Sequence, residues 1–434
     1  MKTFDEIVTK ERLELLRAKR EEHRSFAYKE AQNIIGKETV AELKSVYSMF
    51  DERLMIWLAR LWDPDVGAFY YSNSARDNKG FLPDIESTVQ SIRFMESSGL
   101  MMSNQSKYDK CLPKAMQEKL IAFARSLQDP NDGFFYHAQW GKNIEVPRRG
   151  RDHNWASGLL EDLNAEPLYP TAAQRLSAGV KDSGTPEHLR SVDAFREYLS
   201  SFDLATASYR TGNLLQSQAM QIKAAGKPFT DTLFFWLGEH ILPNGTWQEK
   251  INYDSVNGLM KFMLIYSACD EPFPKPIEAL GSAMDAAMLD EPTSFVCQFY
   301  NPWVAMNSII SNMYKSGAKE RSQELRALIA ARGPELLTKT KEKIIAYQKP
   351  DGSFSYNRTQ SAPFSQGAPV SIPKTNEGDV NATCISSTGM IRNISLMLGI
   401  PVVPMYTAED GKFFFELIEN APSIIKTGVY KPEL

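Results

Sequence analysis

Apolar residues recur at helical spacing along most of this chain. Between residues 39 and 62, for example, they fall three or four positions apart, as on one face of a helix. The alternation typical of strands is nearly absent, so we expect an all-α protein. The same spacing predicts helices at 4–30, 39–62, 84–99, 112–128, 154–164, 187–202, 211–225, 228–241, 253–268, 274–288, 302–316, 319–347, 380–398 and 410–420.

Two short patterns repeat between these helices. The first is a turn of Pro, Asn, Asp and Gly followed by an aromatic residue that can pack over the helix end; its copies are 62–71, 128–136, 242–247 and 348–356. The second is a polar stretch that opens the next helix, at 84–89, 152–157, 252–257 and 378–383, with weaker relatives at 208–213 and 298–303. Internal repeats of this kind indicate a repeated helical hairpin.

Alternating outer and inner helices can close into a toroid, so we expect an (α/α)6 or (α/α)7 toroid formed by residues 1–434 as a single domain. In a toroid the capped starts of the inner helices gather on one rim. The open alternative is an all-α solenoid.

Charge and composition indicate which classes of binding partner to expect. The 434 residues include 49 basic and 53 acidic side chains and 43% apolar residues, so no global field favours nucleic acid or a membrane surface. We expect neither as a partner. The charged N-terminal stretch lacks the apolar core of a signal peptide, so the sequence as given predicts a cytoplasmic protein. If a leader has been removed, we expect a secreted or periplasmic protein instead.

Cysteine and histidine spacing gives no metal pattern. The four cysteines form no CxxC pair, and the five histidines form no HExxH pair. Gly-rich phosphate loops are also absent from the sequence. We therefore expect no metal and no cofactor.

The densest group of polar side chains is residues 147–155. It contains three arginines together with Asp152, His153, Asn154 and Trp155. Arginine binds carboxylates with two parallel hydrogen bonds, and histidine changes charge near neutral pH. Asp152 or Asn154 can cap the helix predicted from residue 154, whose positive end would then face a bound anion. A solvated basic loop before a capped helix is the alternative.

Further candidates come from the starts of the other predicted inner helices. Tyrosines there can transfer protons, tryptophans can stack on sugar rings, and arginines can bind an anion. As substrate-binding residues we expect Arg148, Arg76, Trp155, Trp140, Trp247, Tyr253, Tyr209, Asn381 and Glu86. Helix capping alone explains Asp84, Asp152 and Asp379.

The turn-plus-aromatic repeats resemble those of α/α-toroid proteins. The Arg151–Trp155 segment and the rim tyrosines resemble the polysaccharide lyases that act on uronic acid polymers, most closely polysaccharide lyase family 38, the glucuronan and alginate lyases. The resemblance implies an acidic polysaccharide or oligosaccharide as substrate, cleaved by β-elimination.

In such lyases one group neutralises the uronate carboxylate, a base removes the C5 proton and an acid protonates the leaving O4. By residue type, the resemblance implies Asn154 and Arg151 as neutralisers, His153 as base or neutraliser, and Tyr300 as base and acid. Tyr253 and Tyr209 are substitutes for Tyr300. A tyrosine base needs a lowered pKa, which neighbouring arginines and helix N-termini would supply.

Two other functions remain open from the sequence. A glycoside hydrolase on the same toroid would use two carboxylates from among Glu86, Asp152, Asp254 and Asp379, separated by roughly 5 to 9.5 Å across one cleft. A non-catalytic glycan-binding toroid would need the aromatic residues but no convergent set of Tyr, His, Asn and Arg.

Overall fold

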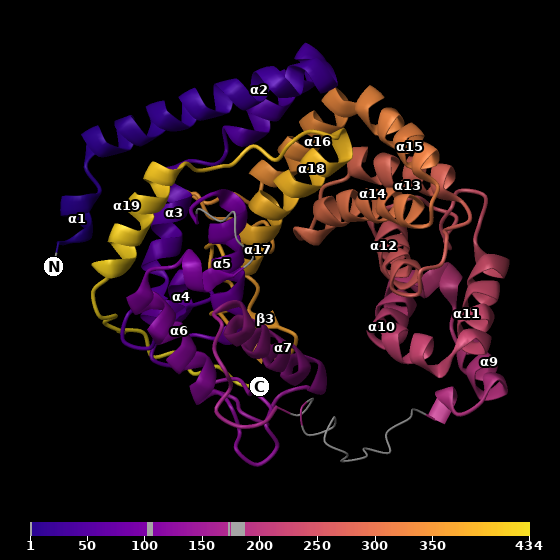
Figure 1. The fold of residues 1–434 in the computed structure, drawn as a ribbon, viewed down its shortest axis with the longest axis horizontal. Helices are drawn as coiled ribbons and strands as arrows, with labels where there is room; N and C mark the ends of the chain where they lie inside the picture. The colour runs from indigo at the N-terminus through magenta and orange to yellow at the C-terminus, as the bar shows by residue number, and fades with distance from the viewer. Residues whose placement is uncertain (1, 102–106, 172–173, 175–186) are drawn as a thin grey trace.

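The structure is a computed structural model that describes residues 2–101, 107–171, 174 and 187–434 (Figure 1). It is mostly helical, as the apolar spacing predicts. The α-helices are α1 Phe4–Ile7, α2 Lys10–Tyr47, α3 Glu52–Arg60, α4 Asn73–Asp77, α5 Ile85–Ser98, α6 Lys114–Ser126, α7 Val146–Asp162, α9 Val192–Ser200, α10 Leu204–Ala225, α11 Lys227–His240, α12 Tyr253–Ala268, α13 Pro276–Met288, α14 Cys297–Lys315, α15 Lys319–Ala331, α16 Gly333–Ile345, α17 Val380–Cys384, α18 Met390–Leu398 and α19 Ala408–Glu419. Two short antiparallel pairs accompany them, β1 Trp62–Asp63 with β2 Ala68–Phe69 and β3 Phe364–Ser365 with β4 Ala368–Pro369.

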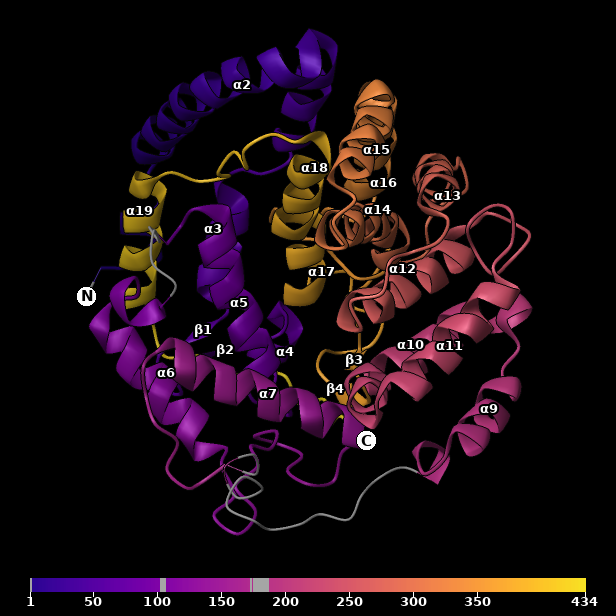
Figure 2. The same ribbon diagram turned by 45° about the vertical axis from the view of Figure 1, so that its right-hand side comes forward.

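The helices form an inner row and an outer layer. The inner row runs α7, α5, α17, a π-helical turn at Ile385–Gly389, α18, α14, α12 and α10, each element contacting the next. Figures 1 and 2 show that this row is curved, with α11 outside α10 and α2 outside α16. Helices from distant parts of the sequence thus lie side by side in this row.

The turn repeat is confirmed in all four copies. Each turn contains a glycine with a positive φ between 74° and 84°, a backbone conformation that favours glycine, at Gly67, Gly133, Gly245 and Gly352. The aromatic residue that follows is buried in each copy: Phe69, Phe135, Trp247 and Phe354. Because the aromatic ring closes the end of the preceding helix, the repeat sets the direction in which the chain returns.

Trp247 is therefore a core residue, and its expected role in stacking on a sugar ring is wrong. Its ring centroid lies 4.3 Å from that of Phe262, and its Nε1–H donates to the carbonyl oxygen of Leu237 at 3.0 Å. Only 2% of its surface is exposed. A buried tryptophan whose N–H is already bonded has no face available to a ligand.

Several predicted helix boundaries differ from the structure. The segment predicted as 319–347 is two helices that meet at Arg332, because Pro334 favours a new helix start. The segment predicted as 39–62 ends its first helix at Tyr47, and Asp51 caps the next by accepting from the N–H of Arg53 at 2.9 Å. These shifts leave the order of the hairpins unchanged.

The two ends of the chain are joined by buried ion pairs. Arg20 of α2, 3% exposed, binds Asp410 of α19 and lies 2.6 Å from Glu52 of α3. Arg12 of α2 also pairs with Glu416 of α19, so the N-terminal and C-terminal helices are linked by more than one ion pair. Within the described part of the chain, no helix is long and apolar enough to cross a membrane.

Candidate functional site

The polar cluster at residues 147–155 lies within a helix and not in a loop before one. Helix α7 begins at Val146, with Pro147 in its first turn, a position that suits proline. The expectation that Asp152 or Asn154 caps a helix is therefore wrong. Since successive helical residues are turned by about 100°, the side chains of this segment point in different directions.

One face of α7 makes a buried ion cluster with α5. The guanidinium of Arg148, 0% exposed, lies 2.9 Å from Glu86, 2.9 Å from Asp152 and 3.5 Å from Asp84. Arg151, which is partly exposed, also pairs with Glu86. Arg148 and Glu86 are thus paired with each other. They join α5 to α7 and, contrary to our expectation, are not free to bind a substrate.

The ion cluster also contacts the long segment between Arg358 and Asp379, which contains β3 and β4. Arg148 donates to the carbonyl oxygen of Ser365 at 3.1 Å, and the Ser365 hydroxyl donates to Glu86 at 3.0 Å. The β3–β4 pair that contains Ser365 is therefore tied to the starts of α5 and α7. Nearby, Trp140 packs against a small separate core that includes Tyr71 and Ala368.

The cluster gives the fold a defined pH dependence. Burial raises the pKa of Asp152 from 3.8 to about 7, with Asp84 and Glu86 adding to the effect. Between these two values the folded state holds a proton that the unfolded state has released, so the free energy of unfolding falls as pH rises through this window. We expect Asp152→Asn to flatten that part of the stability curve, measured by chemical denaturation at several pH values. Asp193→Asn, at an exposed site, is the control, and an unchanged slope in Asp152→Asn would contradict the prediction.

His153 points away from the face of Arg151 and Trp155. Its ring centroid lies 4.7 Å from that of Phe134, and its Nδ1 accepts the backbone N–H of Phe135 at 3.4 Å. The equivalent N–H groups in two other copies of the turn are bound by threonine hydroxyls: Phe69 donates to Thr88 and Phe354 to Thr383, each at 3.0 Å. His153 thus supports the turn repeat, as those threonines do.

Burial lowers the pKa of His153, which keeps the imidazole neutral. Asn154, the next residue, is exposed. Neither residue lines the cleft that contains Tyr300, so the expected convergence of His153, Asn154 and Tyr300 is wrong. The reason is geometric, since positions 153 and 155 lie about 200° apart around a helix.

Residues of the inner helices line a cleft of about 450 Å³ that is open to solvent, which we call the central cleft. It contains two arginines, Arg93 of α5 and Arg392 of α18, both exposed to solvent. Among the described residues neither arginine forms an ion pair, and no Asp or Glu lines the cleft. Its lining residues are Gln90, Arg93, Phe94, Ser97, Trp155, Leu264, Tyr300, Val304, Asn307, Ser308, Cys384, Ile385, Thr388, Gly389, Arg392 and Asn393.

Trp155 of α7 and Tyr300 of α14 both line the central cleft. The guanidinium of Arg93 lies 4.2 Å from the ring centroid of Trp155, a cation–π contact that holds the indole at the cleft wall. Arg151 and Asn381 do not line the cleft but lie one helical turn before the lining residues Trp155 and Ile385. Asn381 accepts from the amide of Gln90 at 3.2 Å.

Tyr300 lies against the π-helical turn. A Cβ atom added to Gly389 would lie 3.2 Å from the Tyr300 hydroxyl, a contact tighter than most real Cβ contacts, so the phenol packs closely against this glycine. The side chain of Asn393 hydrogen-bonds Tyr300, accepts from Asn307 at 3.1 Å and donates to the Gly389 carbonyl at 2.9 Å. π-Helical turns often occur at functional sites.

Burial raises the pKa of Tyr300, whereas the role of base requires a lowered one. The expectation that neighbouring cations lower this pKa below its ordinary value is therefore wrong. The hydrogen bond with Asn393 opposes the effect of burial without overcoming it. Tyr300 is a neutral phenol at neutral pH, which suits a proton donor.

Replacing Asn393 by leucine is expected to raise the pKa of Tyr300 further, because the phenolate loses its amide partner. The measurement is the ultraviolet titration of tyrosinate, taken as the difference between each protein and the same protein carrying Tyr300→Phe. Ser308→Ala is the control, since Ser308 lines the same cleft on α14, the helix that carries Tyr300. A Tyr300 titration that is identical with and without Asn393 would contradict the assignment.

Lys261 is a cation that the sequence reasoning missed. It lies on α12, one turn before the lining residue Leu264, and is half-buried without an ion pair among the described residues. Burial lowers its pKa, and Arg151 lowers it further by repulsion. Arg93, Gln90 and Arg392 were missed as well. Helical spacing offered a signal for some, since Gln90 follows Glu86 by four residues and Arg93 follows Gln90 by three.

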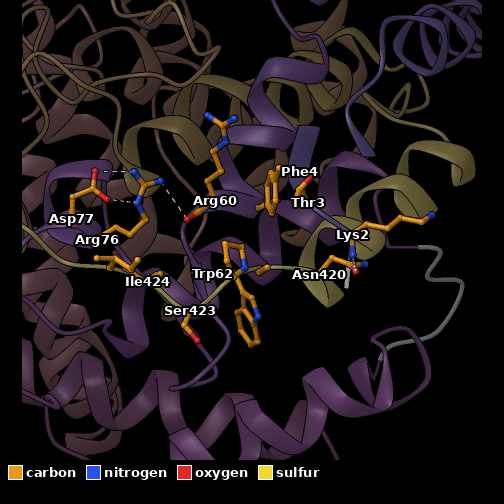
Figure 3. Close-up of a pocket in the computed structure, with 14 residues that line it drawn as sticks. Lys2, Thr3, Phe4, Arg60, Trp62, Arg76, Asp77, Asn420, Ser423 and Ile424 are labelled. Carbon is orange, nitrogen blue, oxygen red and sulfur yellow. Dashed lines mark hydrogen bonds and ion pairs between the residues drawn. The ribbon is translucent and has the colours of Figure 1, made fainter. Parts of the chain in front are cut away.

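The other candidates are placed outside the central cleft. Tyr253 is buried and donates to the carbonyl oxygen of Glu291 at 2.8 Å; burial raises its pKa to about 12. Tyr209 is 38% exposed on α10, and burial of its ring raises its pKa. Arg76 binds Asp77 in a separate pocket near the chain ends (Figure 3).

The carboxylates considered for hydrolysis have other partners. Asp379 is fully buried and accepts the backbone N–H groups of Ala382 at 2.8 Å and Tyr356 at 2.9 Å, as a helix cap does. Asp254 accepts from Gln248 at 3.2 Å, while Glu86 and Asp152 bind Arg148. The described part of the chain also contains no group of three or more His, Cys, Asp and Glu side chains that could hold a metal ion.

Comparisons of the chain with protein-family models, with curated protein sequences and with solved structures find no match.

Proposed function

We propose that the inner and outer helices form an α/α toroid whose central cleft binds an acidic glycan and cleaves it by β-elimination. The observation that carries the proposal is the lining of the cleft. Arg93 and Arg392 are cations that pair with no carboxylate in the described part of the chain, Trp155 offers an aromatic face, and Tyr300 offers a proton. Such a surface favours an anionic sugar, since a guanidinium binds a carboxylate with two parallel hydrogen bonds.

The same lining disfavours hydrolysis by a carboxylate pair. A glycoside hydrolase requires two carboxyl groups facing each other across the bound sugar. The central cleft has none among its lining residues, and the four carboxylates considered are bonded elsewhere. Elimination needs no carboxylate from the protein.

The chemistry divides into three steps on this surface. Arg93 or Arg392 neutralises the uronate carboxylate, which makes the C5 proton more acidic. Lys261, which lies one turn before the lining residue Leu264 and whose pKa is lowered by burial, is the base that we propose for that proton, and the electron pair left at C5 forms the C4–C5 double bond as the C4–O4 bond breaks. Tyr300, a neutral phenol, donates its proton to the leaving O4. In this assignment Tyr300 acts only as the acid, whereas the sequence analysis expected it to act as both base and acid.

The test is incubation of the protein with glucuronan, alginate, pectate, heparan and chondroitin. Ultraviolet absorbance of the unsaturated product is followed together with the number of reducing ends. Absorbance that rises with the reducing ends supports a lyase and identifies its substrate. Reducing ends without absorbance would support hydrolysis, and binding without either signal would support a glycan-binding protein.

A further inference from the structure

A second pocket, of about 520 Å³, lies where the two ends of the chain meet (Figure 3). We call it the terminal pocket. Its walls come from residues 2–4, the end of α3, β1, α4 and the segment 420–425 after α19. No residue lines both this pocket and the central cleft, so it is a separate site. A pocket of this volume can hold a small organic molecule.

The walls of the terminal pocket are largely apolar. They present rings and aliphatic groups from four parts of the chain: Phe4, Ala59, Trp62, Ala421, Pro422, Ile424 and Ile425. Figure 3 shows Phe4 and Trp62 close together at its centre. Trp62 is 3% exposed and lines the pocket, so its indole is almost entirely surrounded by protein.

Two polar groups of the pocket lack partners within the described part of the chain. The Nε1–H of Trp62 donates no hydrogen bond there, although the side chain is almost entirely buried. Arg60 is exposed beside the ring of Phe4, with 5.9 Å between its guanidinium carbon and the ring centroid, and it has no ion pair. The other two cations are paired, Arg76 with Asp77 and Lys2 with Glu416.

Both unpartnered groups are hydrogen-bond donors, and one carries a positive charge. A ligand that complements Arg60 and the pocket walls supplies an anionic acceptor together with an apolar body. We propose that the terminal pocket binds a small amphiphilic carboxylate, with its alkyl chain against Trp62 and Phe4 and its carboxylate at Arg60.

Octanoate is the test ligand, and its affinity for the full chain is measured by isothermal titration calorimetry. We expect saturable binding of one molecule, and a loss of roughly 10- to 100-fold in affinity in Arg60→Gln, the range expected for a hydrogen bond to a charged group. 1-Octanol, which has the same chain without the charge, should bind the wild-type protein more weakly than octanoate.

Arg53→Gln is the matched control, because Arg53 is an exposed arginine of the same helix that pairs with Asp51 outside the pocket. Its octanoate affinity should equal that of the wild-type protein. Equal affinity in Arg60→Gln and wild type, or binding that never saturates, would overturn the proposal. A loss of binding in Arg392→Gln but not in Arg60→Gln would also overturn it, because the anion would then occupy the central cleft.

Discussion

Replacing Arg148 by alanine is expected to lower the free energy of unfolding by about 3–5 kcal/mol, the range typical when one partner of a buried ion pair is removed. The substitution leaves Asp84, Glu86 and Asp152 together in the interior without the guanidinium that neutralises them. It also removes the hydrogen bond to the Ser365 carbonyl. The loss should be greater at alkaline than at acidic pH, because protonation relieves the remaining carboxylates.

Chemical denaturation at two pH values measures this effect. Arg151→Ala is the matched control, since Arg151 is on the same helix and pairs with the same Glu86 but has a side chain that is 40% exposed. We expect it to cost about 1 kcal/mol or less, as exposed ion pairs do. If Arg148→Ala cost no more than Arg151→Ala, the ion cluster would not stabilise the starts of α5 and α7 as we describe.

Replacing Tyr300 by phenylalanine is expected to reduce the rate of elimination by about 10²- to 10⁴-fold, the contribution typical of a positioned acid or base. Only the hydroxyl is removed, and the ring that packs beside Gly389 stays. The unfolding transition should therefore be nearly unchanged. Initial rates of unsaturated product on the polyuronate that the wild-type protein cleaves provide the measurement.

Tyr314→Phe is the control for this change, because Tyr314 is on the same helix with 55% of its surface exposed. It should retain the full rate. A Tyr300→Phe protein that cleaves as fast as wild type would remove Tyr300 from the mechanism and leave the binding role of the two arginines to be tested separately with Arg93→Gln and Arg392→Gln.

The helical class and the turn repeat could be predicted because they depend on local signals. Apolar spacing marks helices, and a glycine with positive φ followed by a buried aromatic residue marks each turn. The site was harder to predict because its residues lie in the middle of helices, where no cap or turn distinguishes them. Arg93, Lys261 and Arg392 have the same local sequence context as any solvated helical cation.

The segment 147–155 shows how one wrong boundary changes the assignment of a site. With a helix start at residue 154, its polar side chains form a single loop; with the start at Val146, they are distributed around α7. Arg148 then enters the interior, His153 supports the turn below Phe135 and Trp155 faces the central cleft.

The ion pairs between α2, α3 and α19 have a consequence for synthesis on the ribosome. Arg20 emerges early, but its partner Asp410 follows 390 residues later. Domains usually begin to fold while the chain is being made, yet this contact cannot form until nearly all of it has been translated. Until then α2 lacks one of the acids that neutralise its buried arginine. A nascent chain stalled before α19 should therefore leave α2 accessible to protease, while a released full-length chain protects it.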